Sequence, residues 1–284
     1  MSSIIRERLQ QYASQTREEE QHALKEILQE VILYGLSESG FFKEALFQGG
    51  TSLRILYHLG RFSEDLDFIL KNPNPNFKWQ PFFHAIEETS SQYGIIPEVT
   101  DKSKMGNAVQ KMTLKDNSIV KFLDLSFRTS PHQKLTIKLE IDTMPPMGSH
   151  SEIKFLDFPV AFSIETQDLA SNFAGKSHAL LCREYIKGRD WYDFLWYVSK
   201  KVSLNFIFLS NAINQKGPWA EQKIEVTPDW YLIELEKKIK SIDWRQAARE
   251  VLPFLNAQDR KTLELWGIPF FLDRVQKLKE TLLS

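Results

Sequence analysis

The pattern of apolar and polar positions changes character near residue 165. Before that point, helical spacing over residues 3–38 gives way to short segments in which apolar and polar residues alternate, as they do in strands. After it, helical spacing dominates to the end of the chain. The pattern predicts an α+β protein, with a mixed α/β domain over residues 1–165 and a helical C-terminal domain over residues 166–284.

The individual elements follow from the same periodicity and from the turn residues between them. We expect helices over residues 3–38, 51–59, 82–93, 168–187, 190–201, 230–240 and 259–283. We expect strands over residues 45–48, 62–70, 95–100, 108–114, 119–127 and 134–142, with one more over residues 153–162.

Composition adds little about partners, because the 284 residues carry a net charge of only −1. The two predicted domains differ, however. Residues 1–165 hold 18 basic and 22 acidic side chains, a balance of −4, whereas residues 166–284 hold 18 and 15, a balance of +3. This split suits an acidic metal-binding part beside a part that faces an anionic substrate, although solvated surfaces produce similar imbalances.

The chain has a single cysteine, Cys182, which excludes an internal disulfide. No apolar run approaches the roughly 18 residues that span a bilayer, and the N-terminus lacks the apolar region of a signal peptide. We therefore expect a cytoplasmic protein with no membrane partner.

The segment GGTS, at residues 49–52, lies between a predicted strand and a predicted helix. Gly49 and Gly50 permit close backbone approach, and Thr51 and Ser52 are residues that cap helices. Free N–H groups at such a helix start favour an anion, and Arg54 is one turn further on. The alternative is an ordinary strand-to-helix turn.

Asp65 and Asp67 are two residues apart in an alternating segment, so both are expected on one strand face. Two ionised carboxylates this close repel each other, and a bound divalent cation relieves the repulsion. Glu140 and Asp142 share a face of a later strand, and either one is a candidate third carboxylate if the strands are neighbours. The alternative is a solvated polar strand face.

Two further sets of residues are candidates. Lys176 is a compact cation and therefore suits a phosphate. Asp190 and Asp193 share a helix face and follow basic residues, so Asp190 is either a catalytic group or an ion-paired orienting group.

Ser63 is two residues before Asp65. A phosphate on Ser63 would add about −1.5 to −2 charge beside the metal ligands, which we expect to inactivate the protein.

The segments GGTSLRILY, SEDLD, KLEI and K…RDWYD occur in this order over residues 47–199. They resemble the AbiEii/AbiGii nucleotidyltransferase-like toxin family, which belongs to the polymerase-β-like nucleotidyltransferase superfamily. The resemblance implies that fold, an NTP cosubstrate and Mg²⁺ or Mn²⁺. It also implies that the protein is a toxin with a cognate antitoxin. The toxin would transfer NMP to an acceptor hydroxyl at the tRNA 3′ end.

By matching positions, the resemblance assigns roles to the candidate residues. Residues 49–52 would hold the triphosphate, Asp65 and Asp67 the metal, and Lys176 a phosphate, with Asp190 and Asp193 completing the helical motif. The family pattern favours Glu140 as the third carboxylate, while strand alternation allows Asp142 equally. The alternative functions are nucleotidyl transfer to a protein or small molecule such as an antibiotic, and a non-catalytic NTP- or RNA-binding module.

Overall fold

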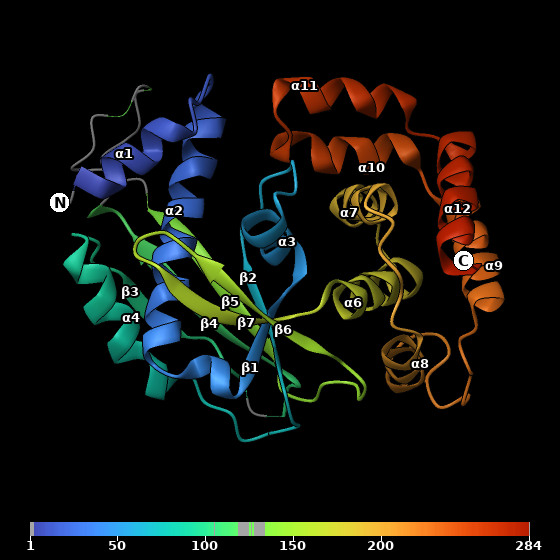
Figure 1. Cartoon of the computed structure of the whole chain (residues 1–284), viewed down its shortest axis with the longest axis horizontal. Helices are drawn as coiled ribbons and strands as arrows, with labels where there is room; N and C mark the ends of the chain where they lie inside the picture. The colour runs from blue at the N-terminus through green and yellow to red at the C-terminus, as the bar shows by residue number, and fades with distance from the viewer. Residues whose placement is uncertain (1–2, 105, 119–124, 126, 128–133, 284) are drawn as a thin grey trace. The chain divides into compact units, whose positions relative to one another are not determined.

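The computed structural model describes residues 3–104, 106–118, 125, 127 and 134–283 (Figure 1). The chain divides into two compact units. The first comprises Met1–His58, Phe62–Pro145 and Glu152–Thr166, and the second comprises Leu59–Arg61, Pro146–Ser151 and Gln167–Ser284. In the described part of the chain, no helix is both long and apolar enough to cross a membrane.

The described residues of the first unit are built on a mixed seven-stranded sheet of order β3-β4-β5-β2-β1-β7-β6. The β1–β2, β3–β4 and β4–β5 pairs are antiparallel, while β1–β7 and β2–β5 are parallel. The strands are β1 (Ala45–Gln48), β2 (Leu66–Leu70), β3 (Glu98–Asp101), β4 (Val109–Asp116), β5 (Leu135–Asp142), β6 (Ser151–Leu156) and β7 (Phe162–Gln167).

Alternation along the central strands separates a buried face from a polar one. On β5, Leu139 and Ile141 are fully buried, and their partners on β2, Leu66 and Phe68, are equally buried. Asp67, between those two β2 residues, therefore lies on the opposite face. The hydrophobic register of two parallel strands thus determines where the acidic side chains are displayed.

The buried sheet face packs against helices of the first unit, and α2 crosses the sheet in Figure 1. Thr16 caps α2, since its side chain accepts a hydrogen bond from the Glu19 amide. Phe41 packs against Phe68 and Trp79 at ring-centroid distances of 4.9 and 5.6 Å. The helices are α1 (Ser3–Gln11), α2 (Arg17–Glu38), η1 (Phe41–Lys43), α3 (Gly49–Tyr57) and α4 (Gln80–Gln92).

The second unit is helical in its described residues and has its own aromatic core. Trp244 stacks on Phe271 at 3.8 Å, and Trp191 packs edge-on against both rings. The elements are α6 (Leu169–Cys182), α7 (Gly188–Ser199), α8 (Phe206–Gln215), α9 (Pro228–Ser241), α10 (Trp244–Val251), η2 (Leu252–Phe254), α11 (Ala257–Arg260), η3 (Lys261–Leu265) and α12 (Ile268–Leu283).

The predicted fold class is confirmed, and the strand at residues 45–48 has the predicted bounds. Three predicted elements are interrupted instead of continuous. Residues 3–38 form two helices, because Thr16 starts a new one. Residues 153–162 span the end of β6 and the start of β7. The helix predicted over residues 259–283 is interrupted before α12. Helix α6 ends at Cys182 and not at residue 187, since the backbone turns extended at Arg183.

Two helices, α8 and α10, were not predicted. The strand predicted over residues 119–127 lies almost entirely outside the described residues. The predicted strand over residues 62–70 is regular only from Leu66, so Asp65 immediately precedes β2. The predicted division at residue 165 stays a prediction.

Candidate functional site

Helix α3 starts directly after β1, at Gly49, where the backbone approaches β2. Gly49 has φ +80°, and a Cβ atom at this position would lie 2.8 Å from Oδ2 of Asp67. Only glycine meets both demands, because other residues are strained at this φ and would collide with the carboxylate. The helix has no side-chain cap from the preceding residue, Gln48. The glycine therefore brings a helix N-terminus, which favours anions, next to an aspartate.

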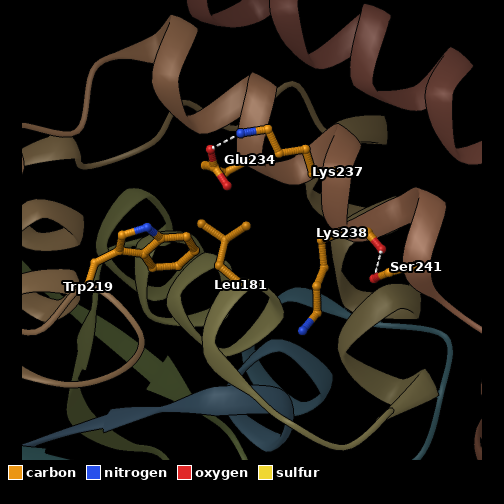
Figure 2. Close-up of a pocket in the computed structure, with 6 residues that line it drawn as sticks. All are labelled: Leu181, Trp219, Glu234, Lys237, Lys238 and Ser241. Atoms are coloured by element: carbon orange, nitrogen blue, oxygen red, sulfur yellow. Dashed lines mark hydrogen bonds and ion pairs between the residues drawn. The ribbon is translucent and has the colours of Figure 1, made fainter.

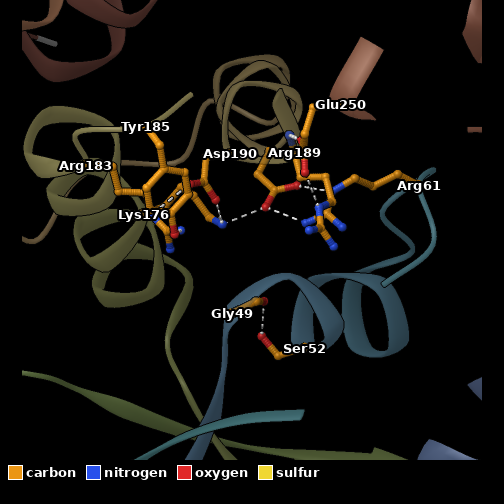
Figure 3. Close-up of polar contacts among 10 residues, drawn as sticks. Gly49, Ser52, Arg61, Lys176, Arg183, Tyr185, Arg189, Asp190 and Glu250 are labelled. Atoms are coloured by element: carbon orange, nitrogen blue, oxygen red, sulfur yellow. Dashed lines mark hydrogen bonds and ion pairs between the residues drawn. The ribbon is translucent and has the colours of Figure 1, made fainter. Parts of the chain in front are cut away.

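Thr51 and Ser52 do not cap this helix as predicted, since α3 already includes both residues. Both are fully buried. The Thr51 hydroxyl donates to the backbone oxygen of Asp65, and the Ser52 hydroxyl donates to the backbone oxygen of Gly49 at 2.8 Å (Figure 3). These bonds fix the segment before β2 and the first turn of α3. Any contact of Thr51 or Ser52 with a ligand would therefore involve their backbone.

The parallel register of β2 and β5 distinguishes the two candidates for the third carboxylate. Asp67 is directly paired with Glu140, whereas Asp142 is paired with Ile69, one pair further along the same face. Asp142 also accepts a hydrogen bond from the Met144 amide at 2.9 Å, which stabilises the turn after β5. Glu140 is therefore the carboxylate next to Asp67.

A lysine that the sequence analysis did not select lies on this acidic face. Lys111 of β4 is directly paired with Glu140, and its Nζ is 2.7 Å from Glu140 Oε1. The hydrogen bond to Glu140 is the main cause of a raised Lys111 pKa, and the charges of Asp65 and Asp67 contribute to the same shift. Lys111 thus experiences all three carboxylates. We call Asp65, Asp67 and Glu140 the acidic cluster.

The acidic cluster suits a hard divalent cation in its chemistry, because Mg²⁺ and Mn²⁺ are bound by carboxylate oxygens. Gly49 supports this fit in one respect, since the missing Cβ lets the start of α3, which favours phosphate oxygens, lie directly against Asp67 Oδ2. Among the described residues, however, no group of three or more His, Cys, Asp or Glu side chains is already arranged to hold a metal ion. The three carboxylates are neighbours, but their oxygens do not surround a common point as metal ligands would.

Two predicted nucleotide contacts have other partners. Arg54 donates from Nε to Glu26 at 2.8 Å and lies over the Phe62 ring. Ser63 lies before β2, so strand alternation does not place it on the face of Asp67. Its backbone oxygen accepts a hydrogen bond from Gln29. The roles of Arg54 and Ser63 in nucleotide binding stay predictions.

In the second unit, Lys176 of α6 binds both aspartates of α7. Its Nζ is 2.7 Å from Asp190 (Figure 3). The same Nζ is 2.8 Å from Asp193. Burial opposes ionisation of Asp190 and is the largest influence, but Lys176, Arg183 and Lys187 together outweigh it and hold the Asp190 pKa at about 2. The pKa of Lys176 is raised, because the two aspartates outweigh the effect of burial. All three groups are therefore charged at neutral pH.

Arg61 is a member of this network that the sequence analysis missed. It donates to both oxygens of Asp193, at 2.6 and 2.7 Å, and its side chain is only 3% exposed. Arg183 Nε lies 3.2 Å from Asp190 Oδ2. We call Lys176, Asp190, Asp193, Arg61 and Arg183 the α6–α7 network. Asp193 is thereby held from two sides, which supports an orienting role.

Gly188, in the same motif, allows α7 to pack closely on α10. A Cβ at Gly188 would collide with the backbone oxygen of Ala247. At the start of α7, Arg189 binds Glu250 of α10 through its backbone amide at 2.9 Å and its Nε at 3.0 Å (Figure 3). These contacts hold α7, which carries Asp190 and Asp193, against α10.

The second unit also has a hollow beside α9 (Figure 2). Its two lysines already have partners, since Lys237 binds Glu234 and Lys238 donates to the backbone oxygen of Arg183. We therefore assign the hollow no part in the chemistry. It is lined by Leu181, Trp219, Glu234, Lys237, Lys238 and Ser241.

Known structures share this fold. A candidate nucleotidyltransferase from Helicobacter pylori superposes with a TM-score of 0.52 at 18% identity, over 90% of this chain and 93% of that one. The protein JHP933 from Helicobacter pylori superposes with a TM-score of 0.55 at 17% identity, over 95% of each chain. A search of curated proteins found no match.

The family comparison is more specific. Residues 31–274 match the model of the nucleotidyl transferase AbiEii toxin family of type IV toxin–antitoxin systems. The match includes the acidic cluster, the glycine turn and the α6–α7 network. The chain is therefore a nucleotidyltransferase that belongs to the AbiEii toxin family, in which a toxin is paired with an antitoxin.

Proposed function

We propose that this protein transfers a nucleoside monophosphate from an NTP to an acceptor hydroxyl, with the tRNA 3′ end as acceptor, and thereby blocks translation. In this reaction the acceptor hydroxyl loses its proton to water and its oxygen forms a bond to the α-phosphorus. The bond between the α-phosphorus and the oxygen that bridges it to the β-phosphorus breaks, and pyrophosphate leaves. The observation that carries the proposal is the position of Asp67, between the glycine start of α3 and Glu140 of β5.

The glycine turn would bind the triphosphate. Gly49, Gly50, Thr51 and Ser52 form the first turn of α3, whose amides and helix dipole favour phosphate oxygens. Because the Thr51 and Ser52 side chains are engaged with backbone oxygens, the amides are the proposed contacts.

Asp65, Asp67 and Glu140 would hold Mg²⁺ or Mn²⁺. Such ions neutralise phosphate charge and lower the pKa of an attacking hydroxyl. The pairing of β2 with β5 favours Glu140 over Asp142 as the third ligand, because Glu140 is paired directly with Asp67.

Lys176 is the proposed phosphate contact of the second unit. Two of its three N–H donors are used by Asp190 and Asp193, and these bonds fix the direction of the ammonium group. In this proposal Asp190 and Asp193 orient Lys176 and do not act on the substrate as acids or bases. Their depressed pKa values suit a permanently ionised partner.

An RNA acceptor is supported by charge. Residues 166–284 carry a balance of +3, and contacts between cations and phosphates dominate affinity for nucleic acids. A tRNA acceptor and a cytoplasmic location fit together, and both belong to this proposal.

The proposal is tested by incubating the purified protein with each α-labelled NTP, Mg²⁺ and total tRNA. Label at the tRNA 3′ end supports it. Label on a protein or on a small molecule would instead identify another acceptor for the same chemistry. If NTP binds without any labelled product, the protein is a binding module and the proposal is wrong.

A further inference from the structure

Glu140 lies between two strands that place opposite charges beside it. On one side β2 pairs it with Asp67, and on the other side β4 pairs it with Lys111. The lysine is the group in contact, since Nζ donates to Glu140 Oε1 at 2.7 Å. The carboxylate that should complete the acidic cluster is thus bound to an internal cation.

This pair is open to solvent and therefore easily exchanged. The Lys111 side chain is 52% exposed and that of Glu140 is 30% exposed. Exposed ion pairs contribute little, typically about 0.2–1 kcal/mol, because water screens them. A divalent cation, which also binds Asp65 and Asp67, can outcompete one ammonium group for Glu140.

We propose that Lys111 acts as a displaceable counter-ion of the acidic cluster: it holds Glu140 in the absence of metal and releases it when a divalent cation binds. The inference rests on the proposed metal-dependent transfer and adds a regulatory step at its metal site. Lys111 is a positioning residue that acts through Glu140.

A double-mutant cycle on Mn²⁺ binding tests this competition. Free Mn²⁺ is measured by electron paramagnetic resonance, without NTP or RNA, for wild type, Lys111→Met, Glu140→Gln and the double variant. If Lys111 competes for Glu140, Lys111→Met tightens the dissociation constant by about two- to fivefold, the factor that a lost exposed ion pair supplies. In the Glu140→Gln background the same substitution should tighten binding by a smaller factor, because the charged ligand for which Lys111 competes is gone and only its charge effect on Asp65 and Asp67 remains.

Lys115→Met is the matched control. Lys115 lies on the same strand and face as Lys111 but is paired with Thr136 and Glu98 in place of the acidic cluster. It should leave Mn²⁺ binding unchanged. Circular dichroism melting of each variant confirms that it is folded before titration.

Three results overturn the inference. Equal tightening by Lys111→Met in both backgrounds would show a general charge effect and no competition for Glu140. Unchanged affinity in the Lys111→Met variant would show that the ion pair is only structural. Absence of Mn²⁺ binding to wild type would remove the metal site itself and, with it, the metal ligands of the proposed function, whereas the first two results leave that function intact.

Discussion

Gly49 and Asp67 approach so closely that a single added carbon on the glycine would lie 2.8 Å from the carboxylate oxygen. We predict that Gly49→Ala abolishes nucleotidyl transfer, because Asp67 must rotate or β2 must shift to accommodate the methyl group. The measurement is the transfer rate of purified protein, together with its melting temperature.

Gly106→Ala provides the control for this variant. Gly106 has a similar φ of +83°, but a Cβ there would meet nothing within 4 Å. Both variants should carry a similar backbone strain of roughly 1 kcal/mol, with the collision at Asp67 added only in Gly49→Ala, and only Gly49→Ala should lose activity. Equal activity in the two variants would contradict the role given to the Gly49–Asp67 contact.

Glu140 and Asp142 should differ in their effect on activity. Glu140→Gln removes a carboxylate paired with Asp67 and should lower the transfer rate roughly 100-fold or more. Asp142→Asn keeps an oxygen that can accept the Met144 amide but removes its charge, so it should leave the rate nearly unchanged and cost at most about 1 kcal/mol of stability. Steady-state rates and urea unfolding of both variants separate these effects. A larger rate loss for Asp142→Asn would reverse the assignment.

The buried Arg61–Asp193 pair should matter for stability. Arg61→Met leaves Asp193 with Lys176 as its cationic partner, and breaking such a buried pair costs about 3–5 kcal/mol. Urea unfolding measures this loss. Arg249→Met, at an exposed position on α10, should change stability by less than about 0.5 kcal/mol. Similar unfolding midpoints for the two variants would show that the bidentate pair is dispensable.

The buried carboxyl group of Glu30 should make the stability of the protein fall as the pH rises toward neutral. Burial raises its pKa from 4.5 to about 7, although the Arg8 guanidinium opposes the shift. Because the folded state holds this proton more tightly than the unfolded state, protonation of Glu30 stabilises the fold. This stabilisation is fully present below pH 4.5 and is lost as the pH rises through about 7, a change of roughly 3 kcal/mol in the free energy of unfolding.

Urea unfolding at several pH values between 5 and 8 tests this dependence. Wild type should lose stability toward pH 8, and Glu30→Gln should lack that decline. Glu87→Gln, at an exposed position on α4, should follow wild type. A Glu30→Gln profile parallel to that of wild type would show that Glu30 does not titrate in this range.

Local patterns in the sequence predicted the glycine turn, strand β1 and the polar face of Asp67, because these depend on neighbours in the chain. They left Glu140 and Asp142 equivalent, since alternation cannot decide which residue of β5 is paired with Asp67. They missed Arg61 and Lys111, whose partners are 132 and 29 residues away. They also predicted that β2 starts at Phe62, because the alternation of apolar and polar residues already begins there, whereas the strand itself starts only at Leu66.

The central claim is that the acidic cluster supports nucleotidyl transfer to RNA. Its most direct test is the Mg²⁺-dependent transfer of α-labelled NMP to tRNA by wild type, Asp67→Asn and Asp157→Asn, the last at an exposed position of the first unit. The account predicts labelled tRNA 3′ ends with wild type and Asp157→Asn, and a loss of roughly 100-fold or more with Asp67→Asn. Equal labelling by Asp67→Asn, or no labelled product with any NTP, would contradict it.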